Sequence, residues 1–257
     1  MRRNTLILLA VASLAGFPLQ EAKAAIVLGT AGNFAVLAGT TVANTGFTTL
    51  TGDLGVSPGT SITGFETITL NGTVHQTDLV AAQAQQDLTT AYTAAATLPF
   101  TQDLSSTVLN GLTLTPGVYS FSSDANLIGT LTLNNQNNPN AQFVFQIGAL
   151  LTAASGSTVI ETNVGSMLPG SNVFWQVGDT ATLETTAAFQ GHILALNSIN
   201  LRTGATILNG SALARNAQVT LQGNTITNSV VPEPATMALA LFGGALSLMK
   251  RSRRDAR

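Results

Sequence analysis

The sequence predicts an all-β solenoid, in which short strands wind into stacked coils, with a single helix beside them. Two similar phrases support this architecture, residues 183–191 and 201–210, because they begin 18 residues apart. A looser copy lies at residues 151–159. Self-similarity at a period near 20 residues is typical of solenoids. The spaced aliphatic residues, the glycines and the abundant threonines favour strands over helices.

The helix is predicted over residues 77–98, where glycine and proline are absent. Its apolar residues recur at spacings of three and four, which places them on one face: Val80, Ala84, Leu88, Ala91, Tyr92 and Ala95. We expect Thr77 to cap the helix, Asp78 to lie in its first turn and Pro99 to end it at or before Leu98. A one-sided helix should lie along the solenoid.

Two strand segments are near copies of each other, residues 143–148 and 173–178. Each carries a glutamine among apolar residues and closes on a glycine. We expect both segments in a wall of the solenoid, with Gln146 and Gln176 buried at equivalent positions and bonded to each other. Asp53, which follows a glycine in a strand-turn unit, is expected to cap a turn through its own backbone.

Both ends of the chain are predicted to be sorting segments. Residues 1–24 combine Arg2 and Arg3, an apolar run and a small-x-small site at residues 22–24, which predicts a signal peptide cleaved after Ala24. Residues 231–257 begin Val-Pro-Glu-Pro and continue with an apolar stretch and a basic tail. This order resembles the PEP-CTERM signal, which implies a Gram-negative host whose exosortase processes the protein. A plain C-terminal anchor with a short transmembrane segment is the alternative.

The charge balance of residues 25–230 excludes several functions. This segment holds two arginines, no lysine and nine carboxylates, a net charge of −7. Such a domain has no basic patch for nucleic acid or for an anionic membrane surface. Cysteine is absent, so no disulfide or thiolate metal site can form. We expect one domain over residues 25–230, without metal or cofactor.

Several segments in order resemble the ice-binding protein family of the DUF3494 type. They are residues 52–59, the alanine-rich helix with residues 87–92, and residues 114–119, 143–148, 172–178 and 212–216. The resemblance implies a right-handed parallel β-helix of triangular section with one long helix alongside. It also implies a flat face that binds ice without catalysis. The two terminal segments predict an exported protein, extracellular or at the cell surface, and we expect it to be a monomer.

The resemblance also implies where ice is bound. The family's phrase is Thr, then Ala or Gly, any residue, and Thr or Asn, and residues 203–206 match it in full. The copy at residues 185–188 keeps the first threonine. We therefore predict an ice-binding face made of six residues in matching coils: Thr152, Ser155, Thr185, Thr186, Thr203 and Thr206. Glu184 and Arg202 are expected at its rim as an ion pair, and Thr132 outside it.

Two rival functions compete with ice binding. A polysaccharide-cleaving enzyme needs clustered carboxylates, whereas the acids here are scattered, and His75 and His192 lack recognisable partners in the sequence. We therefore expect no enzyme activity. A non-catalytic surface or matrix protein that contacts exopolysaccharide is the alternative function, and partition into growing ice would discriminate the two.

Overall fold

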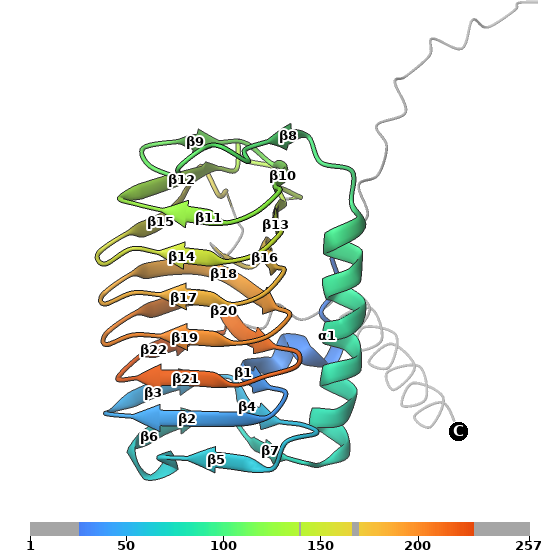
Figure 1. Cartoon of the computed structure of the whole chain (residues 1–257), viewed down its shortest axis with the longest axis vertical. Helices are drawn as coiled ribbons and strands as arrows, with labels where there is room; N and C mark the ends of the chain where they lie inside the picture. The colour runs from blue at the N-terminus through green and yellow to red at the C-terminus, as the bar shows by residue number, and fades with distance from the viewer. Residues whose placement is uncertain (1–25, 139, 166–169, 229–257) are drawn as a thin grey trace, which may run out of the picture.

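The computed structural model describes residues 26–138, 140–165 and 170–228, and these residues form parallel coils with one α-helix alongside (Figure 1). Every strand pairing recorded among them is parallel. The strands collect in a sheet of fifteen and a sheet of seven. The larger sheet contains two ladders. They are joined because β18 (Ala188–Ala195) and β20 (Thr206–Ala214) are long strands whose N-terminal parts pair in one ladder and whose C-terminal parts pair in the other. The strands therefore form three ladders, which we call walls, and the prediction of a mostly β, parallel solenoid is confirmed.

The helix wall is the ladder that lies against the helix α1 (Leu79–Thr97). Its strands, in order along the stack, are β8 (Gln102–Asp103), β10 (Gly117–Phe121), β13 (Phe143–Ile147), β16 (Val173–Val177), the C-terminal parts of β18 and β20, β1 (Phe34–Ala38), β4 (Asp53–Val56) and β7 (Val74–Gln76).

The other two walls carry the remaining strands. The seven-strand wall contains β11 (Ala125–Leu127), β14 (Leu151–Ala153), β17 (Ala181–Leu183), β19 (Ile199–Leu201), β21 (Val219–Gln222), β2 (Thr41–Thr45) and β5 (Ser61–Thr63). The threonine wall contains β9 (Thr113–Leu114), β12 (Thr130–Asn134), β15 (Thr158–Thr162), the N-terminal parts of β18 and β20, β22 (Thr225–Thr227), β3 (Thr48–Thr51) and β6 (Ile68–Asn71). Two short 3-10 helices, η1 (Gly29–Asn33) and η2 (Phe65–Thr67), complete the described fold.

The order of coils in space differs from their order in the chain. The first coils, β1 to β7, lie beyond the last ones, because β1 pairs with β20, β2 with β21 and β3 with β22. The helix α1 then carries the chain to the far end of the stack (Figure 1). Its 19 residues rise about 28 Å, and the six steps across the seven-strand wall span about 29 Å. The helix is therefore long enough to bridge most of the stack.

The interior of the solenoid is filled by aromatic side chains that stack from coil to coil. Tyr119, Phe145 and Trp175 are paired in register, and the rings of Phe145 and Trp175 lie 3.8 Å apart and nearly parallel. Phe189 continues the column at 4.7 Å from Trp175. The indole nitrogen of Trp175 donates to the backbone oxygen of Gln190. This apolar column stabilises a chain that has no cysteine.

The helix packs through one face of small side chains, as its sequence predicts. Ala84, Leu88, Ala91 and Ala95 are buried against wall residues that face outwards from the coils: Val118, Val144, Phe174, Leu194 and Leu213. Alanine at these positions lets the helix backbone approach the wall closely. The expected Val80 is not part of this face, since its side chain is 40% exposed.

The start of the helix differs from the prediction. Asp78, not Thr77, is the N-cap residue, and its carboxylate accepts from the backbone N–H of Ala81 at 2.8 Å. Thr77 lies outside the helix with a φ of 56°. Asp78 also bonds to His75, and these bonds, led by that from Ala81, lower the pKa of Asp78. The helix ends at Thr97, with Leu98 as an extended C-cap before Pro99.

The predicted register of Gln146 and Gln176 is confirmed, but the predicted hydrogen bond between their side chains is wrong. Gln146 and Gln176 are paired in β13 and β16. Their side chains face the helix rather than the interior of the solenoid. The amide of Gln146 donates to the backbone oxygens of Ala95 and Leu98, at 2.8 and 2.7 Å. Because the last carbonyls of a helix lack partners within it, Gln146 acts as a cap from the neighbouring wall.

Asp53 also binds outside its own turn. Its carboxylate accepts from the backbone N–H of Thr73, in the next coil, at 2.8 Å. A second carboxylate oxygen lies 3.7 Å from Nε2 of His75. The residue therefore links two coils rather than capping a turn through its own backbone.

The predicted sorting segments, residues 1–24 and 231–257, lie outside the described residues. In the part of the chain that is described, no helix is long and apolar enough to cross a membrane.

Candidate functional site

The seven-strand wall presents one straight row of short, uncharged side chains to solvent. In β11, β14, β17 and β19 the first and third residues point inwards and the middle one points outwards. The strands β21, β2 and β5 continue that outward position at Thr220, Ala43 and Thr63. The pairing continues from β11 to β5 without a register shift. The outward row, in order, is Asn126, Thr152, Thr182, Asn200, Thr220, Ala43 and Thr63. Seven coils therefore repeat one position at the inter-strand spacing of about 4.8 Å.

The corner after this wall holds most of the residues predicted from the family phrase. The backbone N–H of Gly156 donates to Thr185, and that of Thr186 donates to Thr203, each at 3.0 Å. These bonds place Ser155, Thr185 and Thr203 at one level of three successive corners. All three are exposed.

Thr186 occupies a backbone position that is otherwise taken by glycine. Its φ is 59°, and the equivalent residues of the adjacent corners are Gly156 and Gly204, with φ values of 70° and 69°. A β-branched residue is strained in this left-handed region, whereas glycine is not. The hydroxyl of Thr186 donates to the carbonyl of Thr185 at 2.7 Å, so it is used inside the turn.

The threonine wall begins immediately after the corner. Its first outward row is Thr130, Thr158, Ala188, Thr206, Thr225, Thr49 and Thr69. The second outward row is Thr113, Thr132, Ile160, Gln190, Leu208, Thr227, Thr51 and Asn71. A hollow of about 270 Å³ interrupts this wall between β15 and β22, where Ala188 replaces the threonine of its neighbours.

The structure thus distributes the six predicted residues over a wall, a corner and a second wall. Thr152 lies in the outward row of the seven-strand wall. Ser155, Thr185, Thr186 and Thr203 lie at the corner, and Thr206 begins the threonine wall. Thr132, expected outside this region, belongs to the same wall as Thr206.

Several wall residues escaped the sequence prediction. Thr182, Asn200 and Thr220 flank or extend the row of Thr152. Each is the middle of an apolar–polar–apolar triplet, as in Ala181-Thr182-Leu183. That repeated triplet was the signal from which they could have been found.

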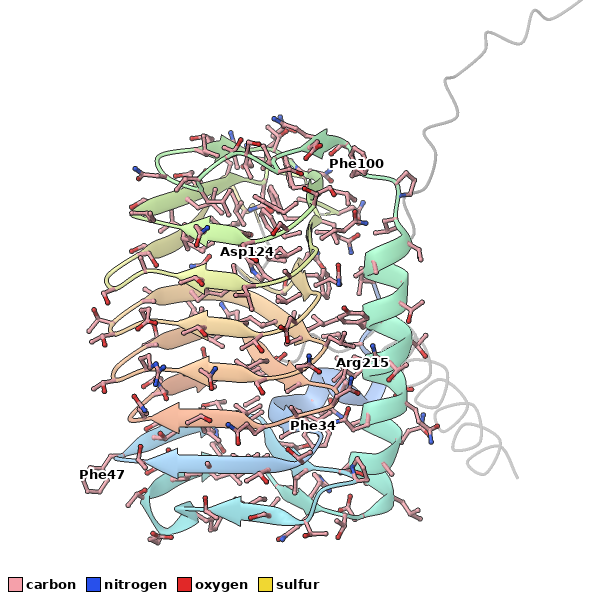
Figure 2. The ribbon with its side chains drawn as sticks, viewed as in Figure 1. Phe34, Phe47, Phe100, Asp124 and Arg215 are labelled. Carbon is pink, nitrogen blue, oxygen red and sulfur yellow. The ribbon has the colours of Figure 1, made fainter. Side chains whose placement is uncertain are left out.

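Charged groups are sparse on the seven-strand wall and lie at its borders. Asp124 precedes β11 at one end of the stack (Figure 2). Glu184 and Arg202 follow β17 and β19 in adjacent coils, at the corner. They form no ion pair, since both ion pairs within the described residues involve His75. Arg202 extends into solvent instead.

The hydroxyls of the seven-strand wall are available to water. Those of Thr152, Thr182 and Thr220 make no hydrogen bond with any other described residue. Some threonines elsewhere differ, because the Thr48 hydroxyl donates to Asn44 and that of Thr67 donates to the carbonyl of Gly64. A row of exposed, unbonded hydroxyls beside methyl groups can hold ordered water at fixed positions.

The two histidines have partners that the sequence did not indicate. Nδ1 of His75 lies 2.7 Å from the Asp78 carboxylate. Nδ1 of His192 lies 2.8 Å from the Ser211 hydroxyl, and both side chains are buried in the helix wall. Burial lowers the pKa of His192 to about 4. This Ser–His pair is closed off from solvent. Nor does any group of three or more metal-ligating side chains occur in the described chain.

A family model described as ice-binding-like matches residues 36–227, which is most of the chain and nearly all of the described fold. The chain belongs to this ice-binding family. An ice-binding protein of Nostoc sp. (strain HG1) is 49% identical over 260 residues, which cover 97% of this chain and 95% of the relative. One of Flavobacterium frigoris (strain PS1) is 32% identical, over 78% of this chain and 75% of the relative.

Solved structures of the family have the same fold. A crystal structure of an ice-binding protein from an Antarctic biological consortium has a TM-score of 0.77 and 43% identity, and covers 88% of this chain and 97% of its own. One from the Antarctic ascomycete Antarctomyces psychrotrophicus has a TM-score of 0.75 and 39% identity, and covers 81% and 100%.

Proposed function

We propose that this member of the ice-binding family adsorbs to ice through the seven-strand wall and the corner beside it, and so inhibits ice growth and recrystallisation without catalysis. The observation that carries the proposal is the unbroken outward row from Asn126 to Thr63, whose seven members are all uncharged. Membership of the family supports the activity, and the register of the strands supports the choice of wall.

The wall has the geometry that ordered water requires. Equivalent residues lie about 4.8 Å apart across strands, and same-face residues lie roughly 6.7 Å apart along a strand. Threonine is stiff at χ1, so a row loses little freedom when it becomes ordered. Each water contact is weak, and adsorption therefore depends on a large array that engages at once.

The corner extends the same array. Thr152 is its member within the wall, and Ser155, Thr185 and Thr203 add a parallel row of exposed hydroxyls. Thr186 is retained in the proposed set as a support of the turn, because its hydroxyl is bonded to Thr185. Thr206 marks the far edge, since it begins the next wall.

The finer features implied by the family resemblance belong to the proposal. They are a right-handed β-helix of triangular section, a monomeric domain over residues 25–230, and export by a signal peptide over residues 1–24. Processing of residues 231–257 by an exosortase would place the domain outside the cell or at its surface. Intact-mass measurement of protein from the native host tests both cleavages.

Replacement of Thr182 by tyrosine tests the proposed wall, because it adds bulk near the centre of the row. We expect Thr182→Tyr to lower the fraction of protein captured by growing ice and to weaken recrystallisation inhibition. The free energy of unfolding should change by less than about 0.5 kcal/mol, since the site is on the surface. Thr90→Tyr, on the exposed face of α1, is the matched control and should behave as wild type.

Two outcomes would contradict the proposal in different ways. If Thr182→Tyr were captured like wild type while keeping its fold, the seven-strand wall would not be the ice-contact surface. If the wild-type domain itself stayed in the liquid, a non-catalytic matrix role, with exopolysaccharide as the partner, would become the better function.

A further inference from the structure

The threonine wall contains a second ordered array, assembled from distant parts of the chain. The strands β22, β3 and β6 lie side by side in uninterrupted register. Each presents two outward residues, two positions apart, on either side of an inward-facing aliphatic residue. The pairs are Thr225 and Thr227, Thr49 and Thr51, and Thr69 and Asn71. We call these six residues the second array.

The hydroxyls of the second array are directed to solvent. Those of Thr49, Thr51, Thr69 and Thr225 make no hydrogen bond with another described residue. The Thr227 hydroxyl accepts from the backbone N–H of Asn209 at 3.3 Å. Thr48 and Asn224, neighbours that face inwards, bond to each other instead, so the outward hydroxyls are selectively left to water.

The second array is backed by a rigid interior. Leu50 and Ile226, which lie between the outward pairs, are fully buried. The outward residues carry no charge, so no ionic side chain interrupts the rows. Exposed large apolar groups, which a protein partner would need as anchors, are absent from its six positions.

The corner separates this array from the seven-strand wall. Phe47 lies in that corner between β2 and β3 and is 88% exposed (Figure 2). Towards β15, the hollow over Ala188 reaches β22, where Thr225 and Thr227 line its edge, and stops short of β3 and β6. The array is therefore a bounded patch on a different wall.

We propose that the second array is a further ice-contact surface, which meets ice in a different orientation from the seven-strand wall. The inference rests on the proposed function, because it assumes that threonine rows of this spacing bind ice. A protein with two such walls can coat two sets of crystal planes. It can also occupy a growing step, where two planes meet.

Single crystals of ice grown in the presence of fluorescently labelled protein test this inference. Wild-type protein should label two sets of planes. Thr49→Tyr, at the centre of the second array, should lose one set, and Thr182→Tyr should lose the other. The double variant should show only background labelling, and Thr90→Tyr should label as wild type. Thr69→Tyr, on the edge strand β6, is a second variant should Thr49→Tyr fail to fold.

The outcomes separate the two proposals. If wild-type protein labels no plane, the proposed function fails. If wild-type protein labels ice but folded Thr49→Tyr and Thr69→Tyr label the same planes as wild type, the second array is not an ice-contact surface. In that case the loss of labelling in Thr182→Tyr would still support the seven-strand wall.

Discussion

His192 makes the stability of this fold depend on pH in a predictable direction. The imidazole stacks on Phe174 at 5.5 Å and is bonded to Ser211, within the helix wall. Burial lowers its pKa from 6.5 to about 4, against a smaller opposing effect of a hydrogen bond to the backbone of Ser171. The native protein therefore keeps this ring neutral under conditions where the unfolded chain would protonate it.

The sign and size follow from the two pKa values. Below pH 6.5 the unfolded state binds a proton that the native state does not bind, so the free energy of unfolding falls as the pH is lowered. The loss continues until the native pKa is reached near pH 4. Integrated over that window, this one side chain removes up to about 3 kcal/mol of stability. Above pH 6.5 it has no effect on the pH dependence.

Thermal unfolding of wild type and His192→Gln between pH 7.5 and pH 4.5 measures this contribution. Glutamine keeps a polar partner for Ser211 but does not titrate. We expect the stability of wild type to fall more steeply than that of the variant. Glu161, whose pKa is raised by burial, acts in the opposite direction, but it is present in both proteins. Parallel pH curves for the two proteins would refute the assignment of the pH dependence to His192.

Two further substitutions probe the polar groups of the interior. Ser157→Ala should raise the free energy of unfolding by about 1 kcal/mol, because the Ser157 hydroxyl is buried without a partner in the described chain. Denaturant unfolding measures this change, and a variant less stable than wild type would contradict the prediction. Gln146→Ala should lower the free energy of unfolding by about 2 kcal/mol, because the carbonyls of Ala95 and Leu98 at the end of α1 lose their hydrogen-bond donor. Gln86→Ala, on the exposed side of α1, is the control for Gln146→Ala. If Gln146→Ala and Gln86→Ala were equally stable, the helix end would need no cap from the wall.

Local patterns in the sequence were sufficient for the type of fold. The 18-residue repeat, the β-branched and glycine-rich composition and one alanine-rich stretch indicated a solenoid with a single helix, and the described residues have that structure. The register of Gln146 against Gln176 was also predictable, because residues in copies of one phrase occupy equivalent places in successive coils. These features depend on neighbouring residues or on adjacent copies.

Features that depend on how distant segments meet were decided by the tertiary structure. The partner of Gln146 is the end of α1, about 50 residues earlier in the chain. The six predicted site residues are divided between two walls and the corner that joins them, and this corner falls inside the family phrase at residues 203–206. A turn of the backbone within four residues sends adjacent side chains to different surfaces, which composition and spacing alone do not reveal.

The second array shows this most clearly. Thr49 and Thr225 are paired although 176 positions separate them, because the first coils stack beyond the last ones. The helix α1 makes that arrangement possible, because it carries the chain along most of the stack between the first coils and the later ones. The sequence by itself determined that threonine pairs alternate with buried aliphatic residues in each strand. Only the stacking order, set by parallel pairing between the two ends of the domain, brought those pairs together into one surface.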